Sequence, residues 1–336
     1  MFILWIRGHH TAARMRTIHT ASELKPQGRK VCLAIGFFDG VHLGHQQIIQ
    51  QTTADAYHHE ALSLVVTFDQ HPNTVVAPQR VPPLIYSLNQ RLRVIERMGC
   101  DALLLLHFDK TFSQQSGDAF IRGLARDLGQ IQSLCVGSTF TFGHKRSGNV
   151  ASLKTLGAEL DFTVHGMAAV SLDGKTVSST RIRETIRAGD LDAASQMLGR
   201  SYSISGMVMR GDQLGHQLGF PTANIDATGL VLPPNGVYSA HTLVRPAGDA
   251  PSHAGVYSDS YIQARAAVNI GYRPTLRSSA PELRVEAHLL DFKDDLYGKE
   301  MEIVFVDKLR EEQKFPSLDA LKEQIAKDIA AARKRF

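Results

Sequence analysis

The sequence is poor in cysteine and has no long apolar run. Its three cysteines, Cys32, Cys100 and Cys135, form no CxxC pair, and two of them lie inside apolar segments. This pattern indicates reduced thiols in the core of a cytoplasmic protein rather than a catalytic thiol, because nothing nearby would lower a thiol pKa. Beyond the N-terminus, the longest strongly apolar run, residues 102–106, is far shorter than the roughly 18 residues that a membrane-spanning helix needs. We therefore expect a soluble protein with no membrane partner.

A large charge imbalance is also absent outside the N-terminus. The net charge is +4, but the first 30 residues hold six cations and one anion, so the other 306 residues sum to −1. A basic groove for nucleic acid is therefore not expected. Residues 1–14 are predicted to be a disordered leader. The alternatives are an upstream start codon, with Met15 as the working start, and an organelle transit peptide.

The length favours two folded domains. A chain of 336 residues is too long for one ordinary core and suits two domains of roughly 150 residues. From residue 31 to about residue 190, continuous apolar runs alternate with helical patterns. This predicts an α/β domain with a doubly wound parallel sheet, helices on both faces, and ligands beyond the carboxyl ends of the strands. The expected strands are 31–36, 62–68, 102–108 and 133–137, and the expected helices are 45–59, 87–99 and 116–129.

The pattern changes after about residue 190. Strand-like segments separated by Gly, Pro and Asp turns predict an antiparallel sheet, closed into a β-barrel. These segments are 202–209, 237–244, 262–271, 282–292 and 300–306. A terminal helix over 317–335 has Ser317 as its expected N-cap. We divide the chain into a leader over 1–14 and domains over 15–188 and 189–336.

The first chemical site is a ten-residue run, 36–45, between the first expected strand and the first expected helix. His42 and His45 are three residues apart at the helix start, so their imidazoles share one face with the free N–H groups of the first turn. Three glycines let the backbone turn and approach a ligand closely: Gly36, Gly40 and Gly44. The run predicts a phosphate site with imidazole donors. The alternatives are plain surface histidines and a metal pair, which lacks a nearby third ligand.

A second loop, residues 177–183, also opens a helix. Its hydroxyl side chains are followed by Arg181 and Arg183. Helix capping together with solvated charge is enough to explain this pattern. Paired with the first loop at the same edge of the sheet, it predicts the other half of a triphosphate clamp.

Four segments carry a resemblance to a known family: GFFDGVHLGHQ (36–46), TFDQHP (67–72), FTFGHKRSG (140–148) and VSSTRIR (177–183). They resemble the adenylyltransferase half of the bacterial bifunctional riboflavin kinase/FAD synthetase family, a relative of the Rossmann-like HxGH nucleotidyltransferases. The resemblance implies that the FMN phosphate attacks the α-phosphorus of ATP and that pyrophosphate leaves. Such a transfer depends on positioning and on charge stabilisation more than on a covalent nucleophile.

The resemblance also implies roles for residues of this half. His42 and His45 would stabilise the charged transition state. The ATP-binding residues would be Gly36, Phe38, Asp39, Gly40, Ser178, Ser179, Thr180 and Arg181. Two positions depart from the family pattern. Phe37 stands where Asn is usual, which would weaken contacts to ATP, and Thr139 stands where Asp is frequent, which removes a charge near the flavin or nucleotide.

The barrel half contains a second candidate site. A glycine-rich stretch, 211–220, leads to Pro221, which fixes the backbone before Thr222 and Asn224. A hydroxyl and a carboxamide at i and i+2 can face one ligand, and such hard oxygen donors suit Mg²⁺ carrying a nucleotide. Taken alone, however, the PTAN segment, 221–224, predicts only a turn.

A strand-like segment, 284–289, alternates between apolar and polar residues, so Glu286 and His288 share the face away from the core. A solvated strand carboxylate is the alternative to a general base at Glu286. With its neighbours, this segment resembles the riboflavin kinase module of the same family. The resembling segments are GFPTAN (219–224), PPNGVY (233–238), VNIGYRPT (268–275), VEAHLLDF (285–292) and DLYGK (295–299).

The resemblance covers roughly Met15 to the C-terminus and implies that Glu286 deprotonates the ribityl hydroxyl of riboflavin as it attacks the γ-phosphate. Thr222 and Asn224 would bind Mg²⁺ with ATP. The ATP-binding residues of this half would be Gly211, Gly215, Gly219, Pro221, Thr222 and Asn224. His216 stands where Arg is common, which would make a phosphate contact weaker and dependent on pH.

The expected function is therefore two-step flavin cofactor synthesis. Riboflavin and ATP would give FMN and ADP at the barrel, and FMN and ATP would give FAD and pyrophosphate at the parallel sheet, with Mg²⁺ as the metal. The alternative is a riboflavin kinase whose N-terminal domain is a nucleotide-binding regulatory module. The flavin-binding residues remain unassigned.

Overall fold

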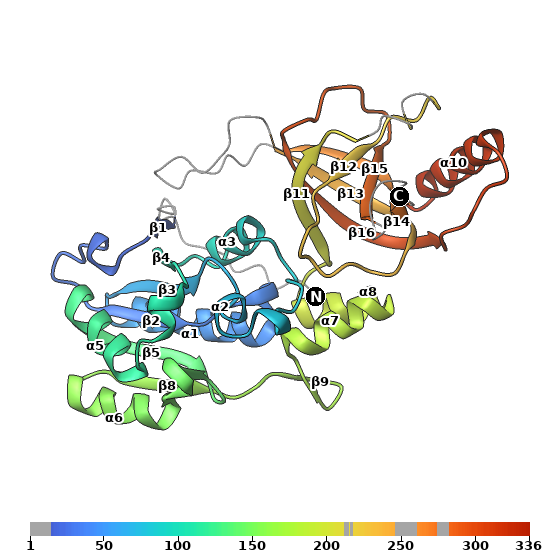
Figure 1. Cartoon of the computed structure of the whole chain (residues 1–336). Coiled ribbons are helices and arrows are strands. Elements are labelled where there is room, and N and C mark those ends of the chain that lie inside the picture. The colour runs from blue at the N-terminus through green and yellow to red at the C-terminus, as the bar shows by residue number, and fades with distance from the viewer. Residues whose placement is uncertain (1–14, 212–214, 216–217, 246–260, 274–281) are drawn as a thin grey trace.

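The computed structural model describes residues 15–211, 215, 218–245, 261–273 and 282–336. Figure 1 shows a parallel sheet flanked by helices in the N-terminal half and a closed barrel with a helix beside it in the C-terminal half. Both predicted folds are confirmed. The leader, residues 1–14, and His216 lie outside the described residues.

The N-terminal sheet has six parallel strands in the order β1-β4-β3-β2-β5-β8. They are β1 (Arg16–Ile18), β2 (Val31–Ile35), β3 (Leu62–Phe68), β4 (Ala102–Leu106), β5 (Ile131–Gly137) and β8 (Thr163–Met167). The four strands expected from apolar runs are β2 to β5. The edge strands β1 and β8 were missed, because one has three residues and the other is polar and partly exposed. The strand order reverses between β2 and β5, where open parallel sheets bind ligands.

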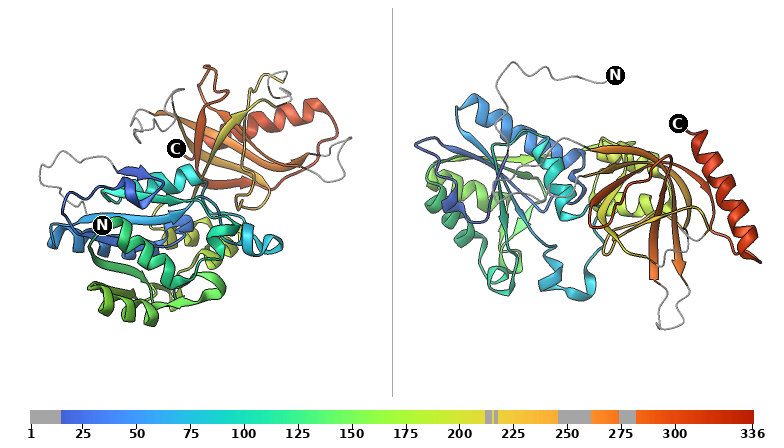
Figure 2. Two further views of the ribbon diagram at one scale, coloured as in Figure 1. Left: turned by 60° about the vertical axis from the view of Figure 1, so that its left-hand side comes forward. Right: turned by 90° about the horizontal axis from the view of Figure 1, so that it is seen from above.

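Helices cover both faces of this sheet, as Figure 2 shows. α1 (Leu43–His58) and α3 (Leu88–Glu96) pack on one face, and α5 (Gly117–Leu128) and α6 (Val150–Leu160) pack on the other. The sequence predicted the first three of these helices but not α6.

The short elements are η1 (Ala21–Glu23), η2 (Asp39–Val41), α2 (Asn73–Val76), η3 (Pro78–Arg80), α4 (Lys110–Ser113), η4 (His144–Arg146), β6 (Thr141–Phe142), β7 (Gly148–Asn149), β9 (Ser171–Leu172) and β10 (Lys175–Thr176).

The barrel closes in the order β11-β12-β15-β14-β13-β16. Its strands are β11 (Ser203–Met209), β12 (Ala223–Ile225), β13 (Gly236–Val244), β14 (Ile262–Arg273), β15 (Glu282–Leu289) and β16 (Glu300–Arg310). The prediction of a simple turn at PTAN was wrong, because Ala223 and Asn224 belong to β12. Three residues are too few for alternation to reveal a strand. The terminal helix α10 (Leu318–Arg333) begins at the expected cap, where the Ser317 hydroxyl accepts the backbone N–H of Ala320 at 3.2 Å.

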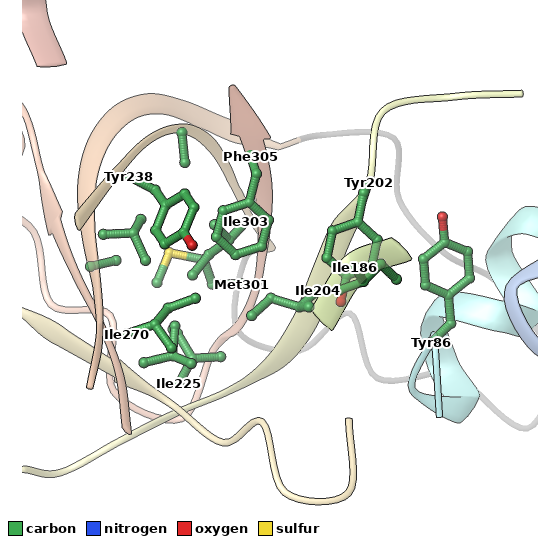
Figure 3. Close-up of a cluster of buried hydrophobic side chains, with 14 of the residues drawn as sticks. Tyr86, Ile186, Tyr202, Ile204, Ile225, Tyr238, Ile270, Met301, Ile303 and Phe305 are labelled. Carbon is green, nitrogen blue, oxygen red and sulfur yellow. The ribbon is translucent and has the colours of Figure 1, made fainter. Parts of the chain in front are cut away.

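Two helices lie at the junction of the halves, α7 (Ser179–Ala188) and α8 (Leu191–Leu198). Their buried apolar residues belong to the same cluster as the barrel interior, which Figure 3 shows from Tyr86 through Ile186 and Tyr202 to Tyr238. The predicted boundary between residues 188 and 189 falls at the end of α7. The core therefore runs through this boundary rather than stopping there.

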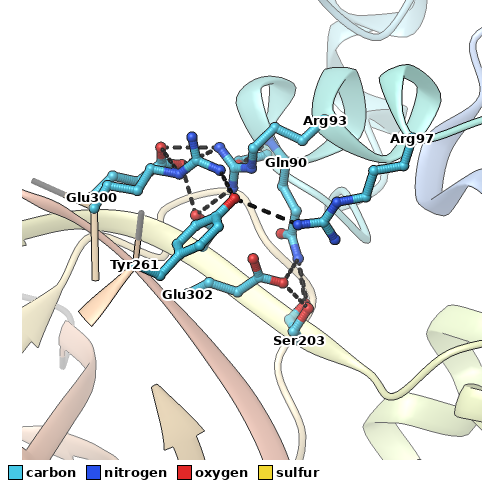
Figure 4. Close-up of polar contacts among 10 residues, drawn as sticks. Gln90, Arg93, Arg97, Ser203, Tyr261, Glu300 and Glu302 are labelled. Carbon is cyan, nitrogen blue, oxygen red and sulfur yellow. Dashed lines mark hydrogen bonds and ion pairs between the residues drawn. The ribbon is translucent and has the colours of Figure 1, made fainter. Parts of the chain in front are cut away.

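Polar contacts also join the halves, between α3 and the barrel (Figure 4). Arg93 forms an ion pair with Glu300 at 2.8 Å, and the Gln90 amide donates to the Ser203 hydroxyl at 2.8 Å. Gln90 and Arg93 are buried. Because buried polar groups must be satisfied, these contacts favour one relative arrangement of α3 and β11.

Candidate active sites

The loop between β2 and α1 holds its two histidines side by side. The His42 and His45 rings stack with 3.6 Å between centroids and 20° between planes, which confirms that they share one face. His42 is the N-cap of α1, and its Nδ1 accepts the backbone N–H of His45 at 3.4 Å. Because Nδ1 accepts, the proton of the neutral His42 ring resides on Nε2, which is the donor left for a ligand.

Both imidazoles are neutral at pH 7. Burial, together with the charges of Arg200 and Arg183, lowers the pKa of His42 to about 4. Burial, then the neighbouring His42 and the charge of Arg91, holds the pKa of His45 well below its usual range. Each neutral ring can offer one N–H donor, and the fixed positive charge near the rings comes from arginines.

These pKa shifts predict a fall in stability at acidic pH. An unfolded histidine titrates near 6.5, so between that pH and about 4 the unfolded chain binds a proton that folded His42 does not. Above pH 6.5 the titration of His42 does not reduce the unfolding free energy. As the pH falls from 6.5 toward 4, the unfolding free energy falls by about 3 kcal/mol. Chemical denaturation across this range should show a shallower pH slope for His42→Gln than for the parent. The exposed His59→Gln control should match the parent, and an unchanged slope in His42→Gln would contradict the assignment.

Two glycines of the loop lie against aromatic rings of the same loop. A Cβ on Gly36 would lie 2.9 Å from the Phe38 ring, and one on Gly44 would lie 3.2 Å from Cε1 of His42. In the structure, Gly36 and Gly44 therefore leave room for the Phe38 and His42 rings. The close approach of the loop backbone to a ligand stays a prediction. Phe38 itself is buried and meets the edge of the His45 ring at 5.3 Å between centroids.

Asp39 joins the two loops that the sequence placed at one edge of the sheet. Its buried carboxylate accepts the N–H of Ile85 at 3.0 Å and of Tyr86 at 3.3 Å, and it pairs with Arg183 at 2.6 Å. The Ser179 hydroxyl donates to the Asp39 backbone carbonyl at 3.0 Å. The two loops therefore meet as predicted. The carboxylate is engaged within the protein, and its role toward ATP stays a prediction.

The second loop caps a helix as well. The Ser178 hydroxyl accepts the backbone N–H of Arg181 at 3.2 Å, which is the capping interaction that the sequence offered as an alternative. The Arg181 guanidinium donates to Leu172 O at 3.2 Å and Lys175 O at 2.9 Å, on either side of the turn between β9 and β10. Thr180 is exposed. The ATP contacts of these residues stay predictions.

Sequence reasoning missed the structural role of Arg91. Its buried guanidinium lies 4.3 Å from the centroid of the Phe37 ring and donates to the carbonyls of Phe37 and Phe68. Phe37, which departs from the family pattern, is thus the surface on which Arg91 stacks. The sequence did contain an indication that Arg91 is buried, because Arg91 falls on the apolar side of the helix predicted over 87–99. Thr139, the other departure, is exposed just beyond β5.

The barrel site follows from the register of three neighbouring strands. Asn224 of β12 lies opposite Glu286 of β15, which lies opposite Asn269 of β14. Val285 and Ala287 are buried in the barrel core, which confirms the alternation and puts Glu286 on the outer face. Asn269 was missed, although it stands in the VNIGYRPT segment, because its partner strand is not apparent from the sequence.

These side chains line a cavity of about 420 Å³. Thr222, Asn224 and Glu286 contribute polar groups, and Leu321 and Ile325 of α10 contribute apolar ones. Its volume and its mixed lining are typical of small-ligand sites. His288 also lines it, with Nδ1 at 2.8 Å from the Pro221 carbonyl oxygen.

Two described glycines of the glycine-rich stretch, Gly211 and Gly215, lie directly against the predicted metal ligands. A Cβ on Gly211 would lie 2.2 Å from Nδ2 of Asn224, and one on Gly215 would lie 3.1 Å from Oγ1 of Thr222. A larger residue at position 211 would displace the Asn224 side chain, and one at position 215 would first meet the Phe220 carbonyl oxygen at 2.5 Å. Gly219 has φ +87°, a backbone conformation that suits glycine.

A group of potential metal ligands lies between α1 and the strands β5 and β8, and it includes none of the predicted site residues. One ligand atom from each of Asp55, Cys135 and His165 lies within 4.8 Å of the others. The Asp55 carboxylate already accepts from Ser133 at 2.7 Å through Oδ2 and from Gln51 at 2.7 Å through Oδ1. Because both oxygens are engaged, we assign this group to the packing of α1 on β5 and β8.

Fold and sites together define a two-site nucleotide-using transferase. One site is a histidine loop at the reversal point of a parallel sheet, and the other is a cavity with a carboxylate and amides on a barrel. The FAD synthetase family model matches residues 24–181, and the riboflavin kinase family model matches residues 198–336. The chain therefore belongs to the family of bifunctional riboflavin kinase/FMN adenylyltransferases.

Several relatives with that name match along nearly the whole chain. The protein from Pseudomonas fluorescens is 37% identical over 95% of this chain and 97% of its own. The protein from Escherichia coli K12 is 34% identical over 96% and 97%. A solved structure from Streptococcus pneumoniae, described as a macrolide-efflux protein, is 26% identical with a TM-score of 0.76 over 95% of this chain and 99% of its own. Within the described part of this chain, we found no helix with the length and apolarity that crossing a membrane requires.

Proposed function

We propose that the enzyme makes FAD from riboflavin in two ATP-dependent steps, with the barrel (residues 189–336) forming FMN and the parallel-sheet domain (residues 15–188) forming FAD. The observation that carries this is the match of a separate family model to each half, with a candidate site in each. The regulatory-module alternative is not favoured, because the FAD synthetase model matches the N-terminal half over 24–181.

At the barrel, we assign Glu286 as the general base for the ribityl hydroxyl. Its register with Asn224 and Asn269, and its place on the cavity wall, support this role. A carboxylate within hydrogen-bond reach of the attacking hydroxyl can take its proton as the bond to the γ-phosphorus forms and ADP leaves. The apolar side chains of Leu321 and Ile325 on the same cavity suit the flavin ring system.

We propose that Mg²⁺ accompanies ATP there. The donors fit a hard cation, since Thr222 offers a hydroxyl oxygen and Asn224 a carbonyl oxygen on the same cavity. Gly211 approaches Asn224 closely and Gly215 approaches Thr222 closely, and neither glycine has a side chain that would occupy the space beside these donors. When bound, the metal would neutralise charge on the phosphates.

At the parallel sheet, we assign His42 and His45 to the reacting phosphate. Neutral imidazole donors at the N-terminus of α1 stabilise negative charge that develops on the α-phosphoryl group as the FMN oxygen attacks and pyrophosphate leaves. Ser179, Thr180 and Arg181, at the start of α7, are assigned to the other phosphates of ATP. The contact between Ser179 and Asp39 supports this placement because it brings α7 to the histidine loop.

We also propose a cytoplasmic location. The three cysteines are free and buried, and burial raises the pKa of Cys100 and Cys135 to about 12. Three unpaired thiols suit a reducing compartment.

The metal assignment predicts a specific effect of Thr222→Val. Removing one oxygen donor should raise the Mg²⁺ concentration for half-maximal riboflavin phosphorylation on the order of tenfold, because hydrogen bonds and contacts to charged groups contribute about 1.5–3 kcal/mol. The measurement is the initial phosphorylation rate across a Mg²⁺ titration in the presence of excess ATP. The exposed Thr228→Val is the matched control. An unchanged Mg²⁺ requirement in Thr222→Val would contradict the assignment.

A further inference from the structure

Arg200 belongs to one half of the chain and binds the catalytic loop of the other. It follows α8 and falls within the segment matched by the riboflavin kinase model. Yet its guanidinium donates to the backbone carbonyl of Val41 at 3.1 Å and to that of Gly40, in the loop that carries the histidines. The same guanidinium lies 5.0 Å from the centroid of the Tyr86 ring.

Gln46 makes a second connection between the same two segments. The Gln46 side chain, on the first turn of α1, donates to the carbonyl of Val41 at 2.8 Å and to that of Leu198 at 2.7 Å. Arg200 also donates to Leu198 O, at 2.8 Å. The end of α8 and the residues after it therefore hold one short segment of the loop through two side chains.

The loop segment that Arg200 and Gln46 bind, Gly40 and Val41, includes a strained backbone conformation at Val41. Gly40 has φ +76° and Val41, a β-branched residue, has φ +39°. A β-branched residue keeps such a conformation only where its surroundings impose it. Val41 O accepts from both Arg200 and Gln46, and its N–H donates to Phe38 O at 3.0 Å. His42 follows immediately, so the position of its ring depends on this conformation.

Arg200 acts on the histidines electrostatically as well. Burial has the largest effect on the pKa of both rings. After burial, the charge of Arg200 is the next largest cause that lowers the pKa of His42, and it lowers the pKa of His45 after the effects of His42 and Arg91. The other charged groups in the same surroundings are Arg91 of α3, Arg183 of α7 and Asp39 of the loop itself. Removal of Arg200 therefore changes both the shape of the loop and the field at its rings.

We propose that Arg200 is a positioning residue for FMN adenylylation, supplied by the segment that precedes the kinase barrel. This rests on the proposed function of the histidine loop. It makes adenylylation dependent on residues 198–200, so that the two halves are coupled in structure although they catalyse separate reactions.

The test is Arg200→Met in the full chain, assayed for each reaction separately. With FMN and Mg-ATP supplied, kcat for FAD formation should fall at least about tenfold, because small misplacements of catalytic groups are costly, while KM for FMN changes less than about twofold. Riboflavin phosphorylation should be retained, which shows that the chain is folded. Arg187→Met, at an exposed arginine of α7, is the matched control and should leave both reactions intact.

Two further variants keep the test decisive if Arg200→Met does not fold. Arg200→Lys keeps the charge but lacks the planar fork that bonds two carbonyls, so it should restore only part of the lost kcat. Gln46→Met removes the hydrogen bonds of the Gln46 amide to the Val41 and Leu198 carbonyls. It should lower kcat for FAD formation while riboflavin phosphorylation is retained. Undiminished FAD formation in Arg200→Met, or an equal fall of both reactions in all three variants, would overturn the proposal. Absence of FAD formation in the parent chain would instead overturn the proposed function.

Discussion

Replacing Glu286 with Gln is expected to lower kcat for riboflavin phosphorylation by about 10²- to 10⁴-fold, the range that general-base catalysis contributes. Gln keeps the size of the side chain on the cavity wall, beside Asn224 and Asn269, but cannot accept the proton of the ribityl hydroxyl. The measurement is the initial rate of FMN formation under saturating Mg-ATP. FAD formation from supplied FMN should stay within about twofold of the parent, because the histidine loop belongs to the other half.

Glu311→Gln is the matched control for this experiment. Glu311 is an exposed carboxylate that pairs with Lys308 at 2.6 Å and does not line the cavity. Its replacement should leave both reactions unchanged. If Glu286→Gln retained more than a tenth of the parental phosphorylation rate, Glu286 would be a solvated strand carboxylate, the alternative that the sequence left open.

Removing the imidazole of His42 or of His45 is expected to lower kcat for FAD formation by about 10²- to 10³-fold, the usual loss when one donor to a developing charge is removed. His42→Asn is the sharper variant, since Asn is a favourable N-cap and can still accept the backbone N–H of His45. A loss in that variant reports the missing Nε2 donor rather than a frayed helix. His45→Gln tests the second ring.

Riboflavin phosphorylation is the internal reference for both histidine variants and should be unchanged. His59→Asn, at the other end of α1 and exposed, should leave both reactions unchanged. FAD formation at the parental rate in His42→Asn and in His45→Gln would show that the loop serves only to bind nucleotide, as the regulatory-module alternative requires.

The central elements of the fold were predictable because their signals are local. The strands β2 to β5 are buried on both faces and appear as continuous apolar runs, and the alternation of Val285, Glu286 and Ala287 placed the carboxylate on the outer face of the barrel. The edge strands and β12 were missed, because short or half-exposed strands carry neither signal.

The residue types of the sites were predictable, but their partners were not. His42 and His45 are close in sequence, and the geometry of a helix start brings their rings together. Arg91 and Arg200 reach the same loop from α3 and from the end of α8, and sequence spacing has no bearing on such contacts. Asn269 joins Glu286 only through the register of β14 and β15.

The most direct test of the account follows the flavins during incubation of the pure protein with riboflavin, Mg²⁺ and excess ATP. Riboflavin should disappear as FMN appears, and FMN should then pass to FAD. Each FAD should be accompanied by one ADP from the first step and one pyrophosphate from the second. Accumulation of FMN with no FAD and no pyrophosphate would contradict the account and make the parallel-sheet domain a binding module.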